Sequence, residues 1–410
     1  MLEKLFLNKN FFLLWTGQMI SQIGDKFYAI ALAWWILQKT NSSIVMGVFM
    51  AASVLPGLIF GIIAGVFIDK YNRKFFIIGS DILRGACVMI IALLSVTDRL
   101  ELWHIFAVAI LLSLASSFFD PTVTAVIPQI VKKEDLTKAN SLSEMIDALS
   151  NIIGPMLGAT FVSYFGFNFV FLFNGMSYLI SAFFEMFIVI PRISNSQSDE
   201  STIIKDIKTG IKYILDRRKL IITIMVIGIA HLFVGALVVS LPILARELSK
   251  DSIQVFGSLQ MMLGIGMLMG AISIQLFGKK ELNDKNLFTY IAALGVFFVS
   301  IAITKSMTGT LLVCYLIILL FIGATIAYAA VYWQSILQVN TSHDMAGRVF
   351  SISSMVGNIS LPLSYGLFGV LLKFISIVKI MIFSGAALII ISMILMYFYN
   401  DTNRSKYSEI

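Results

Sequence analysis

The chain has 410 residues, of which 58% are hydrophobic and only 13% charged, with a formal net charge of +7. A soluble protein could not cover its surface with so few polar side chains, so the composition indicates a membrane protein with many spans. The basic residues are scattered in short segments between apolar runs, which argues against nucleic-acid binding. Both cysteines, Cys87 and Cys314, lie inside apolar runs, so no disulfide framework is expected.

Twelve apolar runs of membrane-spanning length follow one another along the chain, and each is predicted as a helix. The runs cover residues 11–37, 45–68, 75–96, 103–120, 141–163, 168–190, 220–245, 255–277, 286–304, 309–333, 348–372 and 376–398. The predicted fold class is an all-α membrane protein with twelve transmembrane helices. The first run is too long for a signal peptide and lacks a small-residue cleavage site, so it counts as a helix.

The distribution of basic residues predicts the orientation in the membrane. With the N-terminus inside, cytoplasmic segments carry roughly three times as many Lys and Arg residues as external ones, in agreement with the positive-inside rule. Both termini are therefore expected in the cytoplasm. The protein is expected to be a multi-pass protein of a bacterial inner (cytoplasmic) membrane.

The longest polar gap, residues 191–219, separates the first six runs from the last six. Its second part, Ser201 to Lys219, has the pattern of an amphipathic helix, expected to lie under the bilayer and tether the two halves. A partner-binding helix is the alternative. Its apolar face carries Ile203, Ile204, Ile207, Ile211, Ile214 and Leu215. The expected organisation is a bundle at 1–190, this linker at 191–219, a bundle at 220–400 and a tail at 401–410.

The two halves carry weakly matching segments that are separated by about half of the chain. Val45-Met46-Gly47 corresponds to Val255-Phe256-Gly257, and Asp135-Leu136 after Gln129 corresponds to Asp344-Met345 after Gln338. The shared offset predicts two pseudo-symmetric six-helix bundles built as parallel repeats. Transporters built in this way bind substrate between the repeats, near the bilayer midplane.

A short charged connection joins the second and third runs. Asp69 is followed four and five positions later by Arg73 and Lys74, so ion pairs between the two helix ends are expected. The glycines before the connection fall every fourth residue and predict a bare helix face that a neighbouring helix can approach closely. These glycines are Gly57, Gly61 and Gly65.

The pattern Gly65-x-x-x-Asp69-Lys70-x-Asn72-Arg73-Lys74 resembles the signature between the second and third helices of the major facilitator superfamily. The resemblance implies the major facilitator fold, transport by alternating access, and a conformational latch formed by Gly65, Asp69, Arg73 and Lys74. Asn72 stands where the family usually has glycine, and asparagine also tolerates the left-handed conformation expected there. An ordinary charged loop is the alternative reading.

Gly154-Pro155-x-x-Gly158 lies in the middle of the fifth predicted helix. Proline removes a backbone hydrogen bond and glycine permits close packing, so a bend is expected there. The segment is similar to the fifth-helix motif that the superfamily associates with export by antiport, which favours efflux. This segment has fewer glycines than the family's full motif.

Asp25 is expected about 21 Å along the first helix, in a hydrocarbon core of about 30 Å. It shares one helical face with Gln18, Ser21 and Gln22. A carboxylate at that depth costs roughly 2.5–3.5 kcal/mol unless it pairs, faces water or takes up a proton. Asp25 is therefore the leading proton-coupling candidate, and a structural ion pair with a basic residue of another helix is an equally open alternative.

Other charged residues inside the runs receive lesser roles. Glu144 and Asp147 share a face near the start of the fifth helix. They are further proton-coupling candidates, with a solvated helix entrance as the alternative. Asp81 and Arg84 are expected to form an intrahelical pair, and Glu185 is expected at the membrane interface.

Polar and aromatic side chains in the helices predict the character of the substrate cavity. The candidate cavity residues are Gln18, Ser21, Gln22, Asp25, His231, Gln260, Tyr328 and Tyr332. Tyrosine offers apolar area together with a polar group, which suits a bulky amphipathic ligand. Structural or lipid-facing placement is the alternative, and a lone histidine such as His231 is more often structural.

The sequence contains no phosphate-binding Gly-x-x-x-x-Gly-Lys-Ser/Thr pattern and no credible nucleophile–base arrangement, so an enzyme is not expected. The three histidines have no ligand-like spacing, so neither a metal site nor a cofactor is expected. An ion gradient or the gradient of the substrate itself would then drive transport.

Motifs along nearly the whole chain resemble the bacterial macrolide-efflux group of the superfamily. The motifs are Leu14-Trp15-x-Gly17-Gln18-x-x-Ser21, Phe119-Asp120-Pro121 with Pro128 closing the fourth helix, Glu134-Asp135-Leu136, and Gly347-Arg348-Val349-Phe350-Ser351. The resemblance implies multidrug export of hydrophobic compounds, with macrolides as one substrate class.

The expected partners are a small amphipathic substrate, protons and membrane lipids, and the chain is expected to act as a monomer. A lysophospholipid or siderophore translocator of the same fold, or an importer, is the alternative. A receptor or scaffold without transport is disfavoured, because it would not require polar residues inside the helices.

Overall fold

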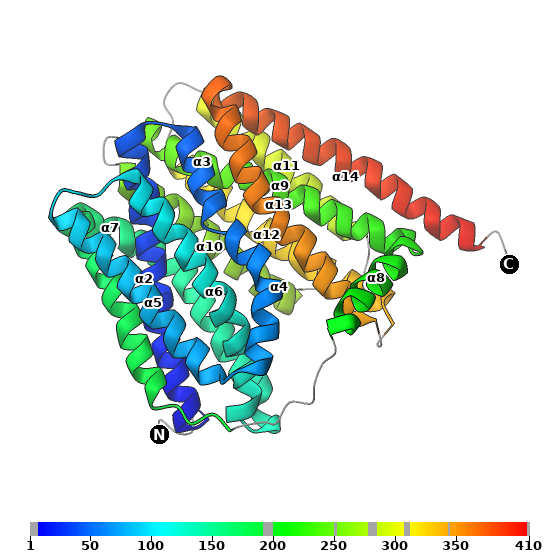
Figure 1. The fold of residues 1–410 in the computed structure, drawn as a ribbon. Coiled ribbons are helices and arrows are strands. Elements are labelled where there is room, and N and C mark those ends of the chain that lie inside the picture. The colour runs from blue at the N-terminus through cyan, green and yellow to red at the C-terminus, as the bar shows by residue number, and fades with distance from the viewer. Residues whose placement is uncertain are drawn as a thin grey trace. The chain divides into compact units, whose positions relative to one another are not determined.

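The computed structural model describes residues 7–191, 200–249, 252–277, 285–306, 312–342 and 345–407, and these contain no β-strand. The predicted all-α class is confirmed (Figure 1). The elements in chain order are α2 (Lys9–Thr40), α3 (Ser43–Ala52), α4 (Leu55–Lys70), α5 (Arg73–Val96), α6 (Leu102–Ile130), η1 (Lys133–Asp135), α7 (Leu136–Met186), α8 (Glu200–Leu215), α9 (Arg218–Leu248), α10 (Ser252–Phe277), α11 (Lys285–Ser306), α12 (Leu312–Asn340), α13 (Ala346–Phe374) and α14 (Ile377–Tyr407).

The described helices account for the twelve predicted spans. Ten stretches are long and apolar enough to cross a membrane. One of them, residues 133–186, holds two helices, because α7 is interrupted at Gly166. The φ angle of Gly166 is 77°, in the left-handed region that glycine adopts without strain. α2 is the remaining predicted span. Its 32 residues are long enough to cross a membrane, but Asp25 and Lys26 lower its hydropathy, so it is not among the ten stretches.

The second predicted helix, 45–68, is divided into α3 and α4, which corrects the sequence prediction. Pro56 lies in the first turn of α4. Proline lacks the N–H that a continuous helix needs and clashes with the preceding turn. Ser113 of α6 satisfies backbone groups at the break: it accepts the Gly57 N–H at 2.9 Å and donates its hydroxyl to the Val54 carbonyl at 3.3 Å.

Replacement of Ser113 with alanine is expected to destabilise the protein by about 1–3 kcal/mol, because it removes both hydrogen bonds at the break. Ser117 provides the matched control, since among the described residues its hydroxyl binds only the Leu114 carbonyl of its own helix, at 2.7 Å. Ser117→Ala should therefore cost less than about 0.5 kcal/mol. Thermal unfolding in detergent measures both effects, and equal melting temperatures for the two variants would contradict the role assigned to Ser113.

The glycine face of α4 is in close contact at one position only. A Cβ atom at Gly57 would lie 2.6 Å from the Ser113 carbonyl oxygen, so α4 and α6 approach closely there. A Cβ atom at Gly61 or Gly65 would meet nothing within 4 Å among the described residues. The expected close approach is therefore observed at Gly57, and it stays a prediction for Gly61 and Gly65.

The fourth helix is longer than predicted. α6 runs to Ile130 and contains both Pro121 and Pro128, so neither proline ends it. Side chains bind backbone carbonyls along this part of the helix: Thr122 donates to the Phe118 carbonyl at 2.5 Å, and Gln129 donates to the Ala125 carbonyl at 3.0 Å.

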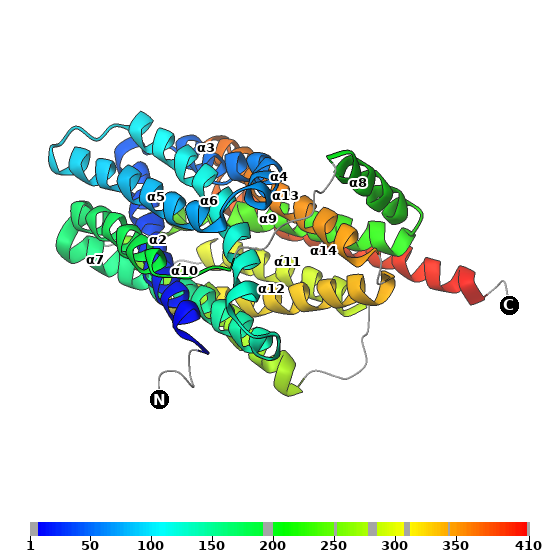
Figure 2. The same ribbon diagram turned by 60° about the horizontal axis from the view of Figure 1, so that its bottom comes forward.

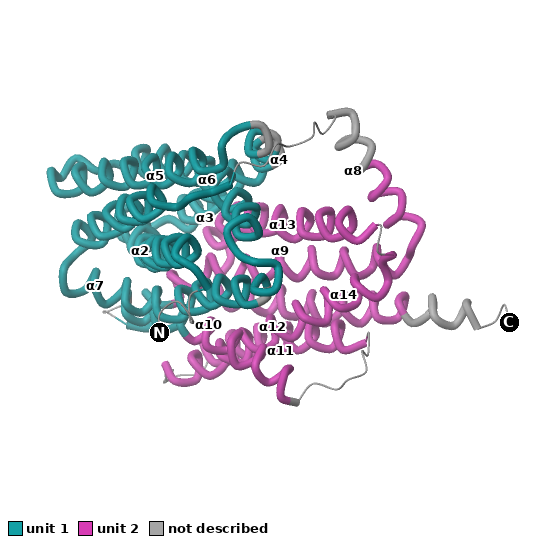
Figure 3. Tube along the Cα trace, turned by 90° about the horizontal axis from the view of Figure 1, so that it is seen from below, with its two compact units in different colours: residues 1–196, 245–261 teal, residues 197–244, 262–410 magenta. Residues whose placement is uncertain are grey.

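The chain divides into two compact units (Figure 3). Unit 1 contains residues 1–196 and 245–261, and unit 2 contains residues 197–244 and 262–410. The end of α9 and the beginning of α10 therefore belong to unit 1.

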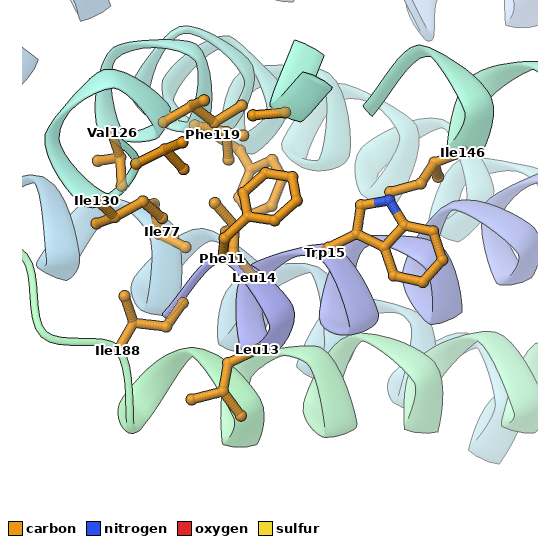
Figure 4. Packing of buried hydrophobic residues seen from close by; sticks show 14 residues of the cluster. Phe11, Leu13, Leu14, Trp15, Ile77, Phe119, Val126, Ile130, Ile146 and Ile188 are labelled. Atoms are coloured by element: carbon orange, nitrogen blue, oxygen red, sulfur yellow. The ribbon is translucent and has the colours of Figure 1, made fainter. Parts of the chain in front are cut away.

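The first turns of α2 anchor an apolar cluster in unit 1 (Figure 4). Phe11, Leu14 and Trp15 of α2 are buried together with Phe119 and other residues of α6. The Trp15 indole N–H donates to the Leu142 carbonyl of α7 at 2.9 Å. The start of α2 is thus tied to α6 and α7, which sets the position of the polar residues two turns further along α2.

Glycines bring the helices of unit 2 into close contact. A Cβ atom at Gly266 of α10 would lie 2.0 Å from the Leu320 carbonyl oxygen of α12, and one at Gly323 of α12 would lie 2.1 Å from a carbonyl oxygen of α10. α11 and α14 meet in the same way, with Gly295 against Gly385. Small residues of this kind let helix backbones approach in lipid, where van der Waals packing drives association.

The predicted amphipathic helix of the linker is present as α8 (Figure 2). It packs on α13. Ile214 is buried in a cluster with Leu337 and Val349. The Tyr213 hydroxyl accepts the Ser342 N–H at 2.9 Å and donates to the Ser342 hydroxyl at 3.1 Å. Part of the expected apolar face therefore contacts unit 2, while Ile211 remains exposed.

Candidate functional site

The second half of α7 packs against α2 along a row of small residues in unit 1. A Cβ atom at Gly17 would lie 2.9 Å from the Ser181 hydroxyl oxygen, and one at Gly24 would lie 2.4 Å from the Ser177 hydroxyl oxygen. The glycines therefore allow the two backbones to approach closely. This contact brings Asp25, the residue after Gly24, against polar side chains of α7.

Asp25 is bound by two side chains of α7. Tyr178 donates its hydroxyl to Asp25 Oδ1, and Asn174 Nδ2 lies 3.5 Å from the same oxygen. Among the described residues, Asp25 forms no ion pair; Arg84 and Lys26 act on it through longer-range electrostatic interaction. The partners observed for Asp25 are thus hydrogen-bond donors, rather than the basic residue that the alternative interpretation required.

Asp81 and Arg84 of α5 form an ion pair inside unit 1. Arg84 Nη2 lies 2.6 Å from Asp81 Oδ1, and their side chains are 5% and 0% exposed. The guanidinium lies 4.0 Å from the ring centroid of Phe119 and 4.9 Å from that of Tyr178. Such cation–π contacts stabilise a cation that has left water. The predicted intrahelical pair is confirmed, and its burial, which the sequence did not predict, makes it part of the site.

Glu185 lies in the same buried region, which the sequence did not predict, while its position near the membrane interface stays a prediction. Its residue exposure is 1%. The Ser181 hydroxyl donates to Glu185 Oε1 over a long 3.4 Å, and Oε2 has no hydrogen-bond partner among the described residues. Glu185 also interacts electrostatically with Asp81 and Arg84.

Two further carboxyl groups lie at the edge of this network. Asp120 of α6 interacts electrostatically with Arg84, Asp25 and Asp147. Asp147, in the first half of α7, interacts with Lys26. The network therefore draws charged residues from α2, α5, α6 and both halves of α7. Asp147 was predicted as a proton-coupling candidate, whereas Asp120 was recognised only as part of a motif.

The other candidates on α2 and α7 lie outside this set of contacts. Ser21 is buried, and its hydroxyl donates to the Gln18 carbonyl at 3.2 Å. Gln18 and Gln22 are half-buried on the same helix. Glu144 is exposed, and no described residue forms a hydrogen bond or ion pair with it. Of the three proton-coupling candidates, the structure thus places Asp25 inside the network, Asp147 at its edge and Glu144 outside it.

The Gly154–Pro155–Gly158 segment is a close-packing site. A Cβ atom at Gly154 would lie 2.4 Å from Lys26 Cβ, and one at Gly158 would lie 2.7 Å from the Phe27 backbone. Within described α7, Gly166 is the residue with non-helical backbone angles, so the helix continues through Pro155. The motif holds Lys26, and with it the turn that carries Asp25, against the first half of α7.

The same segment has a second neighbour within unit 1. A Cβ atom at Gly257 of α10 would lie 2.7 Å from the Pro155 carbonyl oxygen and 2.6 Å from Ala159 Cβ. α7 is therefore packed tightly against α2 through its glycines and against the beginning of α10 through Pro155 and Ala159. A larger side chain at Gly257 would force these helices apart.

The predicted latch residues at the α4–α5 connection bind helix ends. Arg73 Nη1 donates to the Ala125 carbonyl near the end of α6 at 3.3 Å, and Lys74 Nζ donates to the carbonyl of Met186, the last residue of α7, at 2.7 Å. Cations near helix C-termini also interact favourably with the helix dipole. Gly65 is described, whereas the side chain of Asp69 lies outside the described residues, so its expected ion pairs stay a prediction.

Asn72 does not adopt the left-handed conformation expected from the glycine it replaces. Its φ angle is −66°, and its side chain accepts the Lys74 N–H at 3.0 Å as the N-cap of α5. Asparagine is among the preferred N-cap residues because its side-chain oxygen satisfies a free N–H of the first turn. The connection is therefore built as a helix cap.

Three of the four candidates in the second half of the chain, His231, Tyr328 and Tyr332, form contacts within unit 2. His231 Nδ1 lies 2.9 Å from the Ile227 carbonyl of its own helix, and Gln260, on α10 in unit 1, is half-buried. The Tyr328 hydroxyl hydrogen-bonds the Ser273 hydroxyl at 2.9 Å. Tyr332 accepts the side-chain N–H of Asn286 at 2.9 Å, and both tyrosine rings pack against Tyr290.

The arrangement in unit 1 has more carboxyl groups than cations. Arg84 has Asp81 as its direct partner, which leaves Asp25 and Glu185 without an ion pair among the described residues. An unpaired carboxylate removed from water is strongly destabilised, so such groups bind protons. Asp25 and Glu185 are therefore the carboxyl groups of this site at which a proton would remove an unpaired charge.

Comparison with known proteins identifies the family. The family model described as transmembrane secretion effector, a branch of the major facilitator superfamily, matches residues 5–406. The chain belongs to this family. It is 22% identical over 386 residues to macrolide efflux protein A of Streptococcus pyogenes, covering 94% of each chain. It is 26% identical over 378 residues to the putative bacilysin exporter of Bacillus subtilis, covering 92% of this chain and 90% of that one.

Solved transporter structures share the fold of this secretion-effector family member. The nucleoside transporter NupG superposes with a TM-score of 0.74 at 10% identity, over 96% of this chain and 99% of NupG. A bacterial homologue of the iron transporter ferroportin, in an inward-facing state, superposes with a TM-score of 0.71 at 14% identity, over 94% and 98% of the two chains. The chain is thus a multi-pass transporter of the major facilitator type and not an enzyme.

Proposed function

We propose that this protein exports bulky amphipathic compounds, of which macrolide-like drugs are one class, in exchange for protons. The observation that carries the proposal is the position of Asp25, deep in α2 and bound by Tyr178 and Asn174 but by no cation among the described residues. A transporter without a nucleotide site needs a gradient to move substrate uphill. A carboxyl group inside a membrane-spanning helix that can hold a proton couples transport to the proton gradient.

The coupling follows from the energetics of the carboxyl group. An ionised Asp25 in the hydrocarbon region costs roughly 2.5–3.5 kcal/mol, so the ionised state requires access to water or to a charged partner. Protonation removes this requirement and permits the state in which the site is closed to water. Alternating access then exposes Asp25 to one side of the membrane at a time, and substrate and proton leave on opposite sides.

Two features support export. The Gly154–Pro155–Gly158 segment is close-packed on the turn that carries Asp25, so movement of the fifth helix acts directly on the proton site. In addition, relatives that match almost the full length of the chain are an efflux protein and a putative exporter. We also propose that the termini lie in the cytoplasm and that Arg73 and Lys74 act as a latch on the cytoplasmic ends of α6 and α7.

The experiment that tests the function uses inverted membrane vesicles that contain the protein, and vesicles without it as the control. Acidification of the vesicle interior should drive uptake of a labelled macrolide, and an uncoupler should abolish it. A one-unit pH difference can sustain about a tenfold substrate gradient for each proton exchanged, because about 1.4 kcal/mol corresponds to a factor of ten. Uptake equal to that of vesicles without the protein would exclude macrolides as substrates. Lysophospholipids and siderophores would then be the compounds to test.

A further inference from the structure

We propose that Glu185 is a second proton-binding residue, and that it and Asp81 share the single guanidinium of Arg84. The proposal rests on the proposed proton-coupled transport for its purpose, although the contacts that carry it are independent of any substrate. In the state observed, Arg84 pairs with Asp81 and Glu185 holds a proton. Loss of that proton turns Glu185 into a competing partner for Arg84.

The first observation is that several polar atoms in one buried region have no hydrogen-bond partner. Glu185 Oε2 has no hydrogen-bond partner among the described residues, and the residue is 1% exposed. Arg84 Nε and Nη2 and both carboxylate oxygens of Asp81 are also buried without a hydrogen-bond partner among the described residues, and Nη2 forms the ion pair with Asp81 Oδ1 at 2.6 Å. A buried acceptor and a buried donor are thus both free within electrostatic range of each other. Such orphaned groups are rare in native proteins and require an explanation.

The second observation is the balance of charge around Glu185. The charged and titratable groups that surround the Asp81–Arg84 pair are Asp25 of α2, Asp120 of α6 and Tyr178 of α7. Arg84 is the single cation in this group. Lys74, the cation near the end of α7, donates to the Met186 carbonyl and not to a carboxylate.

The charge balance determines the protonation state. One guanidinium neutralises one carboxylate, and Asp81 holds it at 2.6 Å. An ionised Glu185 would then be a buried carboxylate with only a long hydrogen bond from Ser181. Breaking the charge balance of a buried ion pair in this way is strongly unfavourable. Glu185 is therefore neutral in this state, with its proton on the carboxyl group.

The exchange is balanced in atoms and charge. Release of the proton from Glu185, either to water or to Asp81, leaves a carboxylate that interacts electrostatically with the Arg84 guanidinium. If Asp81 takes the proton, the arginine changes partner and the net charge of the group stays constant. If water takes it, the guanidinium bridges two carboxylates. The region therefore stores one proton in addition to the proton of Asp25.

The test begins with the two single variants and the double variant, in purified protein without substrate. Glu185→Gln mimics the neutral acid and should unfold at nearly the wild-type temperature. Asp81→Asn should also fold, because Glu185 ionises and takes over Arg84. Asp81→Asn/Glu185→Gln leaves a buried arginine without a counter-ion. Its loss of melting temperature should therefore far exceed the sum of the two single losses.

An infrared measurement reports the proton itself. The measurement uses an Asp25→Asn background, because the proton of Asp25 gives a carbonyl band of its own. In that background, protein at neutral pH should show a carbonyl band of a protonated carboxyl group. Addition of Glu185→Gln should remove the band, and so should addition of Asp81→Asn, where Glu185 becomes ionised. Glu144→Gln is the control and should leave the band unchanged. Retention of the band in Glu185→Gln, additive melting temperatures, or an Asp81→Asn variant that does not fold would each overturn the proposal.

These outcomes are separate from those of the transport experiment. Neither unfolding nor infrared spectroscopy requires a substrate, so a protein that fails to export macrolides can still show the shared arginine. If the proposal holds and proton coupling also holds, Glu185→Gln should lower the number of protons exchanged per substrate while Asp25→Asn abolishes the exchange.

Discussion

Replacement of Asp25 with asparagine is expected to abolish proton-driven accumulation of substrate. Asparagine keeps the size of the side chain and can still accept a hydrogen bond from Tyr178, but it cannot take up or release a proton. The substrate gradient of about tenfold per pH unit should therefore collapse to equality. The measurement is uptake of labelled substrate into inverted vesicles under an imposed pH difference.

Exchange of labelled for unlabelled substrate without a pH difference separates a coupling defect from a folding defect. The Asp25→Asn carrier should retain this exchange, because the neutral side chain mimics the protonated state. Glu144→Gln removes a carboxyl group that lies outside the buried network, and it should leave both activities within about twofold of wild type, corresponding to less than about 0.5 kcal/mol. Accumulation that survives in Asp25→Asn would return Asp25 to a structural role.

Replacement of Gly266 with alanine is expected to prevent stable folding of unit 2. The added Cβ atom would lie 2.0 Å from the Leu320 carbonyl oxygen, which is backbone and cannot turn away as a side chain can. Overpacking usually costs about 1–3 kcal/mol, and a clash with backbone should reach or exceed the upper end of that range. Size-exclusion chromatography of the solubilised protein, followed by thermal unfolding, measures the loss.

Gly366→Ala is the matched control within the same unit. A Cβ atom there would meet nothing within 4 Å among the described residues, and the position lies inside α13. Alanine favours the helix by roughly 0.5–1 kcal/mol over glycine, so this variant should be unchanged or slightly more stable. Equal behaviour of the two variants would show that α10 and α12 do not approach as closely as the structure indicates.

The overall architecture could be predicted from the sequence, because membrane-spanning helices are marked by long apolar runs. The division into α3 and α4 was missed although Pro56 marks it, since the run remains apolar across the break. The group that makes the break tolerable, the Ser113 hydroxyl, is 56 residues away from Gly57 in the chain. Likewise, Asn72 was treated as a replacement for glycine, whereas its side chain caps α5.

The candidate site could be predicted only in part. Asp25 stands out because a carboxylate in an apolar run demands an explanation. Its partner Tyr178 lies 153 residues later, and nothing in a single sequence indicates that these two helices meet. Arg84 and Asp81 were correctly paired because their i, i+3 spacing is local. Their connection to Glu185 depends on packing between helices, which local spacing does not contain.

The low apolar content of α2 has a consequence for synthesis of the protein. α2 is not among the stretches apolar enough to span a membrane by composition, because it carries Asp25 and Lys26. Tyr178, whose hydroxyl binds Asp25, is synthesised 153 residues after Asp25. At 5–20 residues per second this interval lasts about 8–30 s. We expect the insertion machinery to shelter α2 during this interval, and a stop in translation before Tyr178 should leave α2 poorly inserted.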